Sequence, residues 1–215
     1  MTQKLSRGRV STGLLIVIAA LAAGFGLWFG NRWFNPEPPQ LKAALLYPQP
    51  RAIPDFELQR ANGGTLTLAD WKGRWNLVFI GFTHCPDVCP TALAILKQAW
   101  MRWQQEGRAK DVRVNFISVD PARDTPDVLK TYVAFFSPDF VAATGSDAQL
   151  EKLSTSLGMV YARHELDGGD YSVDHSANVL IIDPQGRLAG MFRPGNYDAD
   201  SLVADLDTLI EKAAP

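Results

Sequence analysis

Residues 76–91 of this chain read Asn76-Leu-Val-Phe-Ile-Gly-Phe-Thr-His-Cys-Pro-Asp-Val-Cys-Pro-Thr91. The first seven are almost wholly apolar, which predicts a strand that is buried on both faces of a sheet. Two cysteines, Cys85 and Cys89, follow at once, and Pro90 is expected at the first position of a helix, where its missing N–H costs nothing. A helix N-terminus carries partial positive charge, so we expect it to favour a thiolate and to lower the pKa of a cysteine there.

The sequence around this stretch predicts a regular alternation of strands and helices. Segments 56–60 and 65–68 alternate apolar and polar residues around Asn62-Gly63-Gly64, which predicts a hairpin. A helix with its apolar face at spacings of three and four is expected to end near Gly107. Further strands are predicted at 112–119, 140–144, 159–166, 179–182 and 188–192, and further helices at 126–136, 147–157 and about 202–210. This order is typical of a thioredoxin-like α/β fold, a central sheet flanked by helices.

The N-terminal part of the chain predicts a membrane anchor. Residues 13–30 contain no charge, and as a helix they span about 27 Å, close to the thickness of a hydrocarbon core. We therefore predict a transmembrane helix at 13–34 and a cytoplasmic N-terminus at 1–12. Aromatic residues at one end and basic residues before the other support this orientation: Trp28, Trp33 and Phe34, and Lys4, Arg7 and Arg9. The globular part is then expected on the periplasmic side of a bacterial-type inner membrane, held by a single span.

A cleaved signal peptide is the alternative for this segment, with Ala20-Leu21-Ala22 as the cleavage site. The apolar run continues well past that tripeptide, which favours the uncleaved anchor. After it, residues 35–52 are rich in proline and predict a stiff extended linker, so that the thioredoxin-like domain is expected at 53–215.

The charge distribution argues against binding to nucleic acid. The whole chain carries 21 basic and 23 acidic residues, and four of the basic ones lie in the first 35 residues, where no acid occurs. The remainder therefore has 17 basic against 23 acidic side chains. A nucleic-acid-binding domain would need a basic face.

Cys85 and Cys89 are the chain's two cysteines, and a disulfide between them would close almost no loop. A stabilising disulfide therefore explains the two cysteines poorly, and a functional role for both sulfurs is the better interpretation. Three intervening residues leave room for an ion between the sulfurs. Thiolates are soft ligands that select Cu(I), zinc or iron–sulfur clusters. Clusters usually need four cysteines and structural zinc usually has four protein ligands, whereas copper is satisfied with two sulfurs and one imidazole.

Three histidines are candidates for the third ligand. The side chain of His84 is expected to point away from that of its neighbour, and His164, in a polar strand, is expected to be solvated. His175 lies on a predicted loop before the buried strand 178–182, where Asp174 and Ser176 could orient its ring. From the residues alone, a structural role for His175 stays open beside a ligand role.

A charged loop follows the second buried strand. Asp120, Arg123 and Asp124 are interpreted as a solvated turn that caps the next helix, with partner docking near the metal as the alternative. Asp87, between the two cysteines, is interpreted as a turn residue, with control of access to the sulfurs as the alternative.

Three blocks of the sequence, in the same order, resemble the Sco/SenC family of copper chaperones. They are Cys85-Pro-Asp-Val-Cys-Pro90, Ser118-Val-Asp-Pro-Ala-Arg-Asp-Thr-Pro126, and Asp174-His-Ser176 with Ile182-Asp-Pro-Gln-Gly186. The resemblance implies that Cys85, Cys89 and His175 bind copper. It also implies that the protein delivers copper to the dinuclear site in subunit II of cytochrome c oxidase, or keeps that site's cysteines in reduced form. The implied partners are subunit II or its assembly factors, and an upstream copper donor.

Two other functions compete with this one. A thiol–disulfide oxidoreductase would use Cys85 and Cys89 as attacking and resolving thiols and would not require His175. A peroxidase is a weaker alternative, because Pro54-Asp55-Phe56 resembles the start of a peroxiredoxin. That family has a threonine three residues before its reactive cysteine, and here the position is Phe82.

Overall fold

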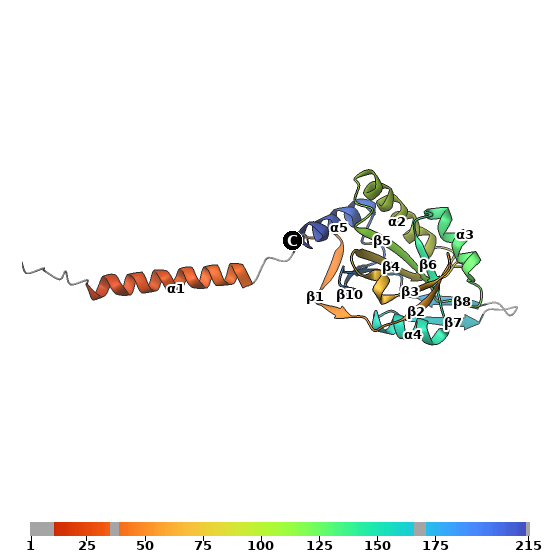
Figure 1. The fold of residues 1–215 in the computed structure, drawn as a ribbon, viewed down its shortest axis with the longest axis horizontal. Coiled ribbons are helices and arrows are strands. Elements are labelled where there is room, and N and C mark those ends of the chain that lie inside the picture. Colours follow the sequence, from red (N-terminus) through yellow and green to blue (C-terminus); the bar gives the residue numbers. More distant parts are fainter. Residues whose placement is uncertain (1–10, 35–38, 166–170, 214–215) are drawn as a thin grey trace, which may run out of the picture. The chain divides into compact units, whose positions relative to one another are not determined.

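The computed structural model describes residues 11–34, 39–165 and 171–213, and its contacts divide the chain into two units, Met1–Gln40 and Leu41–Pro215 (Figure 1). The first unit holds one helix, α1 (Thr12–Phe34). In the second unit the elements are β1 (Ala44–Ala52), β2 (Glu57–Arg60), β3 (Thr65–Thr67), the 3-10 helix η1 (Leu68–Trp71), β4 (Trp75–Gly81), α2 (Val88–Gln105), β5 (Val112–Ser118), α3 (Pro126–Phe136), β6 (Val141–Thr144), α4 (Asp147–Ser156), β7 (Tyr161–Glu165), β8 (Tyr171–His175), β9 (Val179–Ile182), β10 (Arg187–Phe192) and α5 (Ala199–Ala213).

The helix α1 presents its apolar side chains to the outside along its described length. Thr12–Asn31 is long and apolar enough to cross a membrane, by length and composition. Trp28 is among the exposed aromatic residues. The side chains of Trp33 and Phe34, and the basic residues before the helix, lie outside the described part of the chain.

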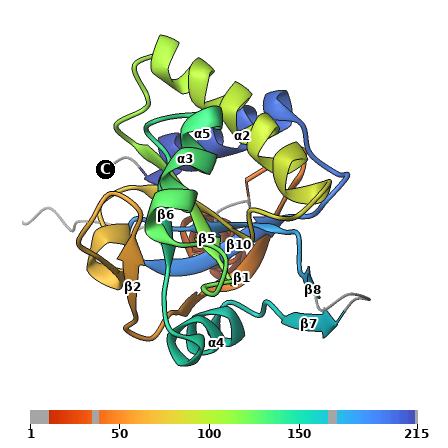
Figure 2. The same cartoon turned by 90° about the vertical axis from the view of Figure 1, so that its right-hand side faces the viewer.

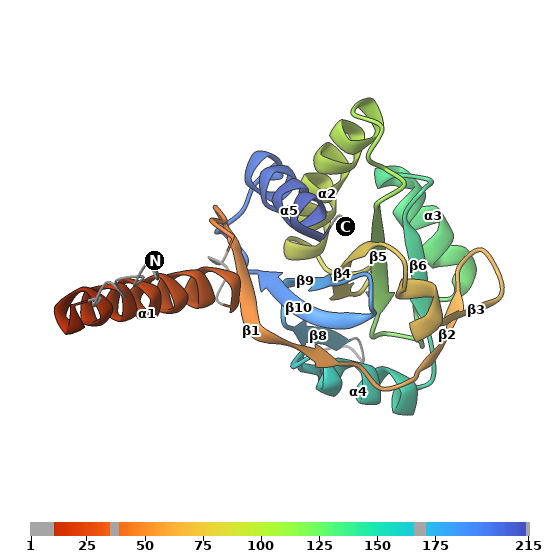
Figure 3. The same cartoon turned by 60° about the vertical axis from the view of Figure 1, so that its left-hand side comes forward.

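The second unit is built on an eight-stranded sheet of order β1-β10-β9-β4-β5-β6-β2-β3 (Figures 2 and 3). Its three central strands β4, β5 and β6 are parallel, and β9 pairs antiparallel with β4. Every residue of β4 is buried, as its apolar sequence predicts. Side chains of β4 alternate between two cores: Leu77 and Phe79 face one, Val78 and Ile80 the other.

Helices cover both faces of this sheet. The first core is closed by α2, α3 and α5, and the second by α4, η1 and the two-stranded β7–β8 hairpin (Figure 2). This is the predicted thioredoxin-like α/β arrangement, with the predicted strands and helices in the predicted order. The helix Pro126–Phe136 and the strand Val179–Ile182 have the predicted bounds.

Two strands were not predicted, β8 and β1, and β1 lies in the range interpreted as a linker. Ala44–Ala52 forms β1, the edge strand, which pairs antiparallel with β10. Its register shifts between Leu46 and Arg51, around Pro48 and Pro50. Proline is tolerated at such an edge because one side of the strand needs no ladder hydrogen bond. The compact unit therefore begins at Leu41, earlier than the predicted boundary at residue 53.

The entry into β1 is fixed by a buried carboxylate on the last helix. Asp205 of α5 accepts hydrogen bonds from the N–H groups of Lys42 (2.6 Å), Ala43 (2.8 Å) and Ala44 (2.7 Å). The side chain is 1% exposed, so water cannot replace it as an acceptor.

We expect Asp205→Ala to lower the free energy of unfolding by on the order of 3 kcal/mol, because it leaves three backbone donors without their charged acceptor. Urea unfolding of the chain in detergent micelles would measure the loss. Asp200→Ala on the same helix is the control: Asp200 is exposed and pairs with Arg102, so its loss should cost less than about 1 kcal/mol. Equal effects from the two variants would contradict the anchoring role.

Candidate metal centre

The cysteines lie where β4 ends and α2 begins. β4 ends at Gly81, and α2 begins at Val88, so Cys85 lies in the connecting turn and Cys89 in the first helical turn. Pro90 was predicted at the first position of this helix, but it is the third residue of α2. The difference costs nothing, since the first four N–H groups of a helix have no partner within it.

The topology of the sheet brings His175 to the same place. Because β9 runs antiparallel to β4, with Val179 opposite Phe79, the chain that precedes β9 arrives at the carboxyl end of β4. His175 is the last residue of β8, opposite Tyr161 of β7. It therefore ends a strand, where a loop was predicted, and the short segment to Val179 carries the chain into the main sheet.

Cys85, Cys89 and His175 each offer one ligand atom, and these three atoms lie within 4.8 Å of one another. The distance from Cys89 Sγ to His175 Nε2 is 3.4 Å. Both cysteines are free thiols; Cys89 is buried and Cys85 partly buried. Among the residues that the structure describes, this is the one cluster of three or more metal-ligating side chains.

The ring of His175 is held with one nitrogen toward the sulfurs. Its Nδ1 lies 3.2 Å from the carbonyl oxygen of Ser176, which can only accept, so Nδ1 carries the proton and Nε2 keeps its lone pair. The rings of Phe79 and Phe82 lie nearly perpendicular to the imidazole, at centroid distances of 6.0 and 5.8 Å. Burial lowers the pKa of His175, which favours the neutral, ligating form.

Burial also affects the protonation of Cys89. The sequence predicted a lowered pKa for a cysteine at the helix N-terminus, but the pKa of Cys89 is raised. Burial raises the pKa of this thiol, and the charges of Cys85 and Asp124 raise it further, while a backbone hydrogen bond to Phe82 acts against them. The helix N-terminus, whose effect is about 0.3–1 kcal/mol, does not offset the loss of solvent. Cys89 is therefore a neutral thiol near neutral pH, and a metal must displace its proton to bind.

Gly81 makes room for the buried sulfur, a role that the sequence did not reveal. A Cβ atom at this position would lie 2.6 Å from Cys89 Sγ, 3.2 Å from Phe116 Cε2 and 3.3 Å from Phe79 Cε1. A glycine at the end of a buried strand, directly before a cysteine turn, is the signal that could have found it.

The other two histidines lie apart from the cluster. His84 is half exposed, with its Nδ1 3.1 Å from the Thr83 hydroxyl and 3.8 Å from Asp124. His164 is exposed and its Nε2 lies 2.9 Å from Asp174. Asp174 was expected to orient His175, but successive residues of β8 point to opposite faces, so its carboxylate turns toward His164 instead. Ser176 does orient the ring, through its backbone carbonyl and not through its hydroxyl.

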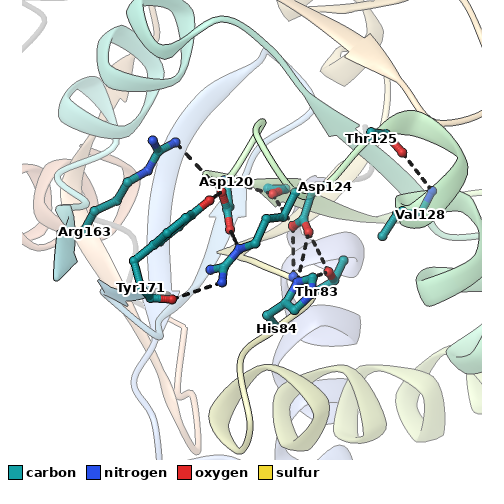
Figure 4. A network of polar contacts seen from close by, with 10 residues as sticks. Thr83, His84, Asp120, Asp124, Thr125, Val128, Arg163 and Tyr171 are labelled. Carbon is teal, nitrogen blue, oxygen red and sulfur yellow. Dashed lines mark hydrogen bonds and ion pairs between the residues drawn. The ribbon is translucent and has the colours of Figure 1, made fainter. Parts of the chain in front are cut away.

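A buried carboxylate ties the cysteine turn to the loop after β5. Asp124 accepts hydrogen bonds from the N–H of Thr83 (2.9 Å), the hydroxyl of Thr83 (2.5 Å) and the hydroxyl of Ser118 (2.5 Å) (Figure 4). Thr83 lies two residues before Cys85. The carboxylate thus fixes the start of the turn that carries the first sulfur.

A second buried carboxylate ties the β7–β8 hairpin to the same loop. Asp120 accepts hydrogen bonds from Arg123 Nε and from the Tyr171 hydroxyl, both at 2.6 Å (Figure 4). The guanidinium of Arg123 lies 3.8 Å from the centre of the Tyr171 ring and donates to the Tyr171 carbonyl at 3.0 Å. Since Tyr171 begins the strand that ends at His175, these contacts hold the histidine side of the cluster in place.

These contacts correct the interpretation of the loop as a solvated turn. Asp120 and Asp124 are completely buried. The cap of α3 is Thr125, whose hydroxyl accepts from the N–H of Val128 at 3.4 Å. The two carboxylates instead join the elements that carry Cys85 and His175.

A hollow of about 260 Å³ borders the end of the cysteine turn at Asp87. Apolar and small residues dominate its lining. They include Val88, which follows Asp87 in the turn and is 43% exposed, and Ala177, two residues after His175.

A thioredoxin-like domain in which two cysteines and one histidine meet at the strand ends has the donor set of a soft-ligand metal site. The SCO1/SenC family model matches residues 46–211, and the chain belongs to this family. A putative copper-binding protein from Stutzerimonas stutzeri is 41% identical over 149 residues, which cover 69% of this chain and 72% of the relative.

Two solved structures of ScoI proteins with copper bound are similar to this chain. The Arabidopsis thaliana protein is 33% identical with a TM-score of 0.68, and the match covers 74% of this chain and 99% of that one. The Bradyrhizobium japonicum protein is 36% identical with a TM-score of 0.67, covering 73% and 98%.

Proposed function

We propose that this protein is a membrane-anchored copper metallochaperone that holds one copper ion between Cys85, Cys89 and His175. The observation that carries the proposal is the convergence of two sulfurs and one imidazole nitrogen within 4.8 Å. This donor set is soft, as copper prefers, and its three members fall one short of a structural zinc site. Family membership and the copper-bound relatives support the same ion.

The ion is cargo in this proposal, and the site suits its transfer. Three protein ligands leave a coordination position that an incoming sulfur can occupy, and Cys85 is only partly buried. For each copper–sulfur bond formed to the acceptor, one bond to this chain breaks, and each released cysteine takes up a proton. The raised pKa of Cys89 favours that return to the thiol and therefore the release of copper.

The proposed acceptor is the dinuclear copper site in subunit II of cytochrome c oxidase, reached directly or through assembly factors, and an upstream protein supplies the ion. The helix α1 anchors the chain in the inner membrane, with the basic N-terminal residues in the cytoplasm and the domain on the periplasmic side. In this proposal the copper site and the acceptor domain face the same compartment.

Thiol–disulfide exchange with the acceptor's cysteines is the second candidate function. Two free thiols within 4.8 Å of each other favour it, because one can attack a disulfide and the other can resolve the mixed disulfide. In that reaction the acceptor's disulfide is reduced to two thiols, and Cys85 and Cys89 become a disulfide.

The test mixes the full-length chain in detergent, loaded with Cu(I) without oxygen, with the metal-free soluble domain of oxidase subunit II. We expect the acceptor to gain copper, measured as the metal content of the two proteins after separation, while this chain returns to free thiols. A Cys85→Ser/Cys89→Ser variant is the control and should transfer nothing.

A second arm offers the acceptor with its cysteines oxidised and the chain without copper. Rapid reduction of the acceptor, together with no transfer of copper in the first arm, would replace the chaperone by the thiol–disulfide function.

A further inference from the structure

A single guanidinium contacts both segments that carry the proposed ligands. The Cζ atom of Arg123, in the loop after β5, lies 3.8 Å from the centre of the Tyr171 ring and 5.9 Å from the centre of the Phe82 ring. A cation within about 6 Å of an aromatic face is attracted to it. Phe82 precedes Cys85 by three residues, and Tyr171 precedes His175 by four. Arg123 therefore joins the cysteine turn to the β7–β8 hairpin.

Two hydrogen bonds fix this guanidinium. Its Nε donates to the Asp120 carboxylate at 2.6 Å, and its Nη1 donates to the Tyr171 carbonyl at 3.0 Å. The other oxygen of the same carboxylate accepts from the Tyr171 hydroxyl at 2.6 Å (Figure 4). The side chain of Arg123 is 20% exposed and that of Asp120 is completely buried, so solvent screens the pair weakly. A planar guanidinium can make these bonds at fixed angles while its face covers the ring, which a lysine ammonium cannot do.

The ring of Phe82 connects Arg123 to the imidazole. This phenyl ring is buried and lies perpendicular to the ring of His175, with 5.8 Å between the centroids. Neighbours in a close-packed interior cannot shift independently. The hairpin provides a second connection, because Tyr171 and His175 begin and end the same strand, β8. Among the described residues β8 pairs with β7 alone, so side-chain contacts decide its position relative to the sulfurs.

We propose that Arg123 is a positioning residue that sets the separation between the imidazole of His175 and the two sulfurs. Without its guanidinium, β7 and β8 stay paired, but the imidazole loses both of its connections to Arg123. The three ligand atoms then meet less often at the distances that copper needs. This inference rests on the proposed copper site and names the residue that keeps the site in its ligating geometry.

Arg123→Lys keeps the positive charge beside Asp120 and removes the planar face and the paired donors. The full-length chain in detergent would be titrated anaerobically with Cu(I) against a chelator, and the imidazole resonances of His175 recorded by NMR without copper. We expect Cu(I) affinity to fall by about tenfold or more, as for other groups that support a metal ligand, and the metal-free resonances to shift. Tyr171→Phe removes one oxygen atom and keeps the ring under the guanidinium, so it should reduce the affinity by less. It answers the same question if the lysine variant does not fold.

Arg163→Lys is the matched control. Arg163 also lies over the Tyr171 ring, at 5.3 Å, and 3.9 Å from Asp120, but it belongs to β7 and therefore contacts the hairpin from within. It should leave Cu(I) affinity and the His175 resonances unchanged.

Two outcomes would separate this inference from the proposed function. If Arg123→Lys and Tyr171→Phe behaved like Arg163→Lys, or only lowered the melting temperature of the metal-free chain, the inference would be overturned while the copper site stood. If the unchanged chain bound no copper, the proposed function would fail, and the metal-free resonances of His175 alone would decide the inference.

Discussion

Replacing His175 with alanine is expected to weaken copper binding by more than about 100-fold, yet to leave the exchange between the Cys85–Cys89 dithiol and its disulfide nearly unchanged. Loss of groups that only orient a ligand costs about 10- to 100-fold in metal affinity, and His175 is itself the proposed ligand. The dithiol needs no imidazole to cycle. An anaerobic Cu(I) titration against a chelator measures the first quantity, and equilibration with a glutathione buffer measures the second.

The other two histidines provide the controls for this experiment. His164→Ala and His84→Ala remove exposed rings that lie outside the cluster, so both should keep the copper affinity of the unchanged chain. If His175→Ala reduced copper affinity and dithiol cycling equally in a folded protein, the separate roles of sulfurs and imidazole would be wrong. If it changed neither, His175 would be structural and thiol exchange would be the better function.

Gly81→Ala is expected to lower the free energy of unfolding by about 3 kcal/mol and copper affinity by more than about tenfold. Overpacking a close-packed core typically costs about 1–3 kcal/mol, and the new methyl would lie 2.6 Å from Cys89 Sγ. That sulfur ends a short side chain in a filled core, so it can yield only by turning away from His175. Urea unfolding and the Cu(I) titration measure the two losses.

Gly190→Ala separates the loss of stability from the loss of the site. A Cβ at Gly190 would lie 2.3 Å from the carbonyl oxygen of Leu45, on the neighbouring strand at the edge of the sheet. It should therefore destabilise the fold but leave the copper affinity of the folded fraction unchanged. If Gly81→Ala bound copper as tightly as the unchanged chain, the prediction that the new methyl group displaces Cys89 Sγ would be wrong.

The sequence predicted correctly those helices and strands whose apolar residues follow one regular spacing. The apolar run before the cysteines, the helix that begins at Pro126 and the strand at 179–182 each have one consistent signal, and the structure confirms them. β1 was missed because its two prolines favour an extended linker, while its place at the sheet edge depends on pairing with β10, far away in sequence. β8 was missed for a related reason: its partner is β7 and not the main sheet.

The three candidate ligands were predicted by residue type and motif, and the structure brings them together, but their surroundings could not be predicted from the sequence. Burial raises the pKa of Cys89 against the effect of the helix terminus, and no local pattern gives the balance between these two effects. The charges of Asp120 and Asp124 suggested solvent, whereas their hydrogen bonds to Ser118, Thr83, Arg123 and Tyr171 make complete burial possible. Polar residues in a loop are interpreted as exposed unless their partners are known.

The separate pairing of the β7–β8 hairpin gives the two halves of the site different resistance to opening. Cys89 is buried beside the central strand β4, whose amides are bonded on both sides, so its exposure requires unfolding close to the global one. In the described part of the chain, the ladder bonds of β8 run to β7 alone. The hairpin can therefore separate as a unit by breaking its side-chain contacts, chiefly those of Tyr171, with the eight-stranded ladder intact. An ion held by all three ligands would cross-link two segments 86 residues apart, and its departure can begin with a local fluctuation.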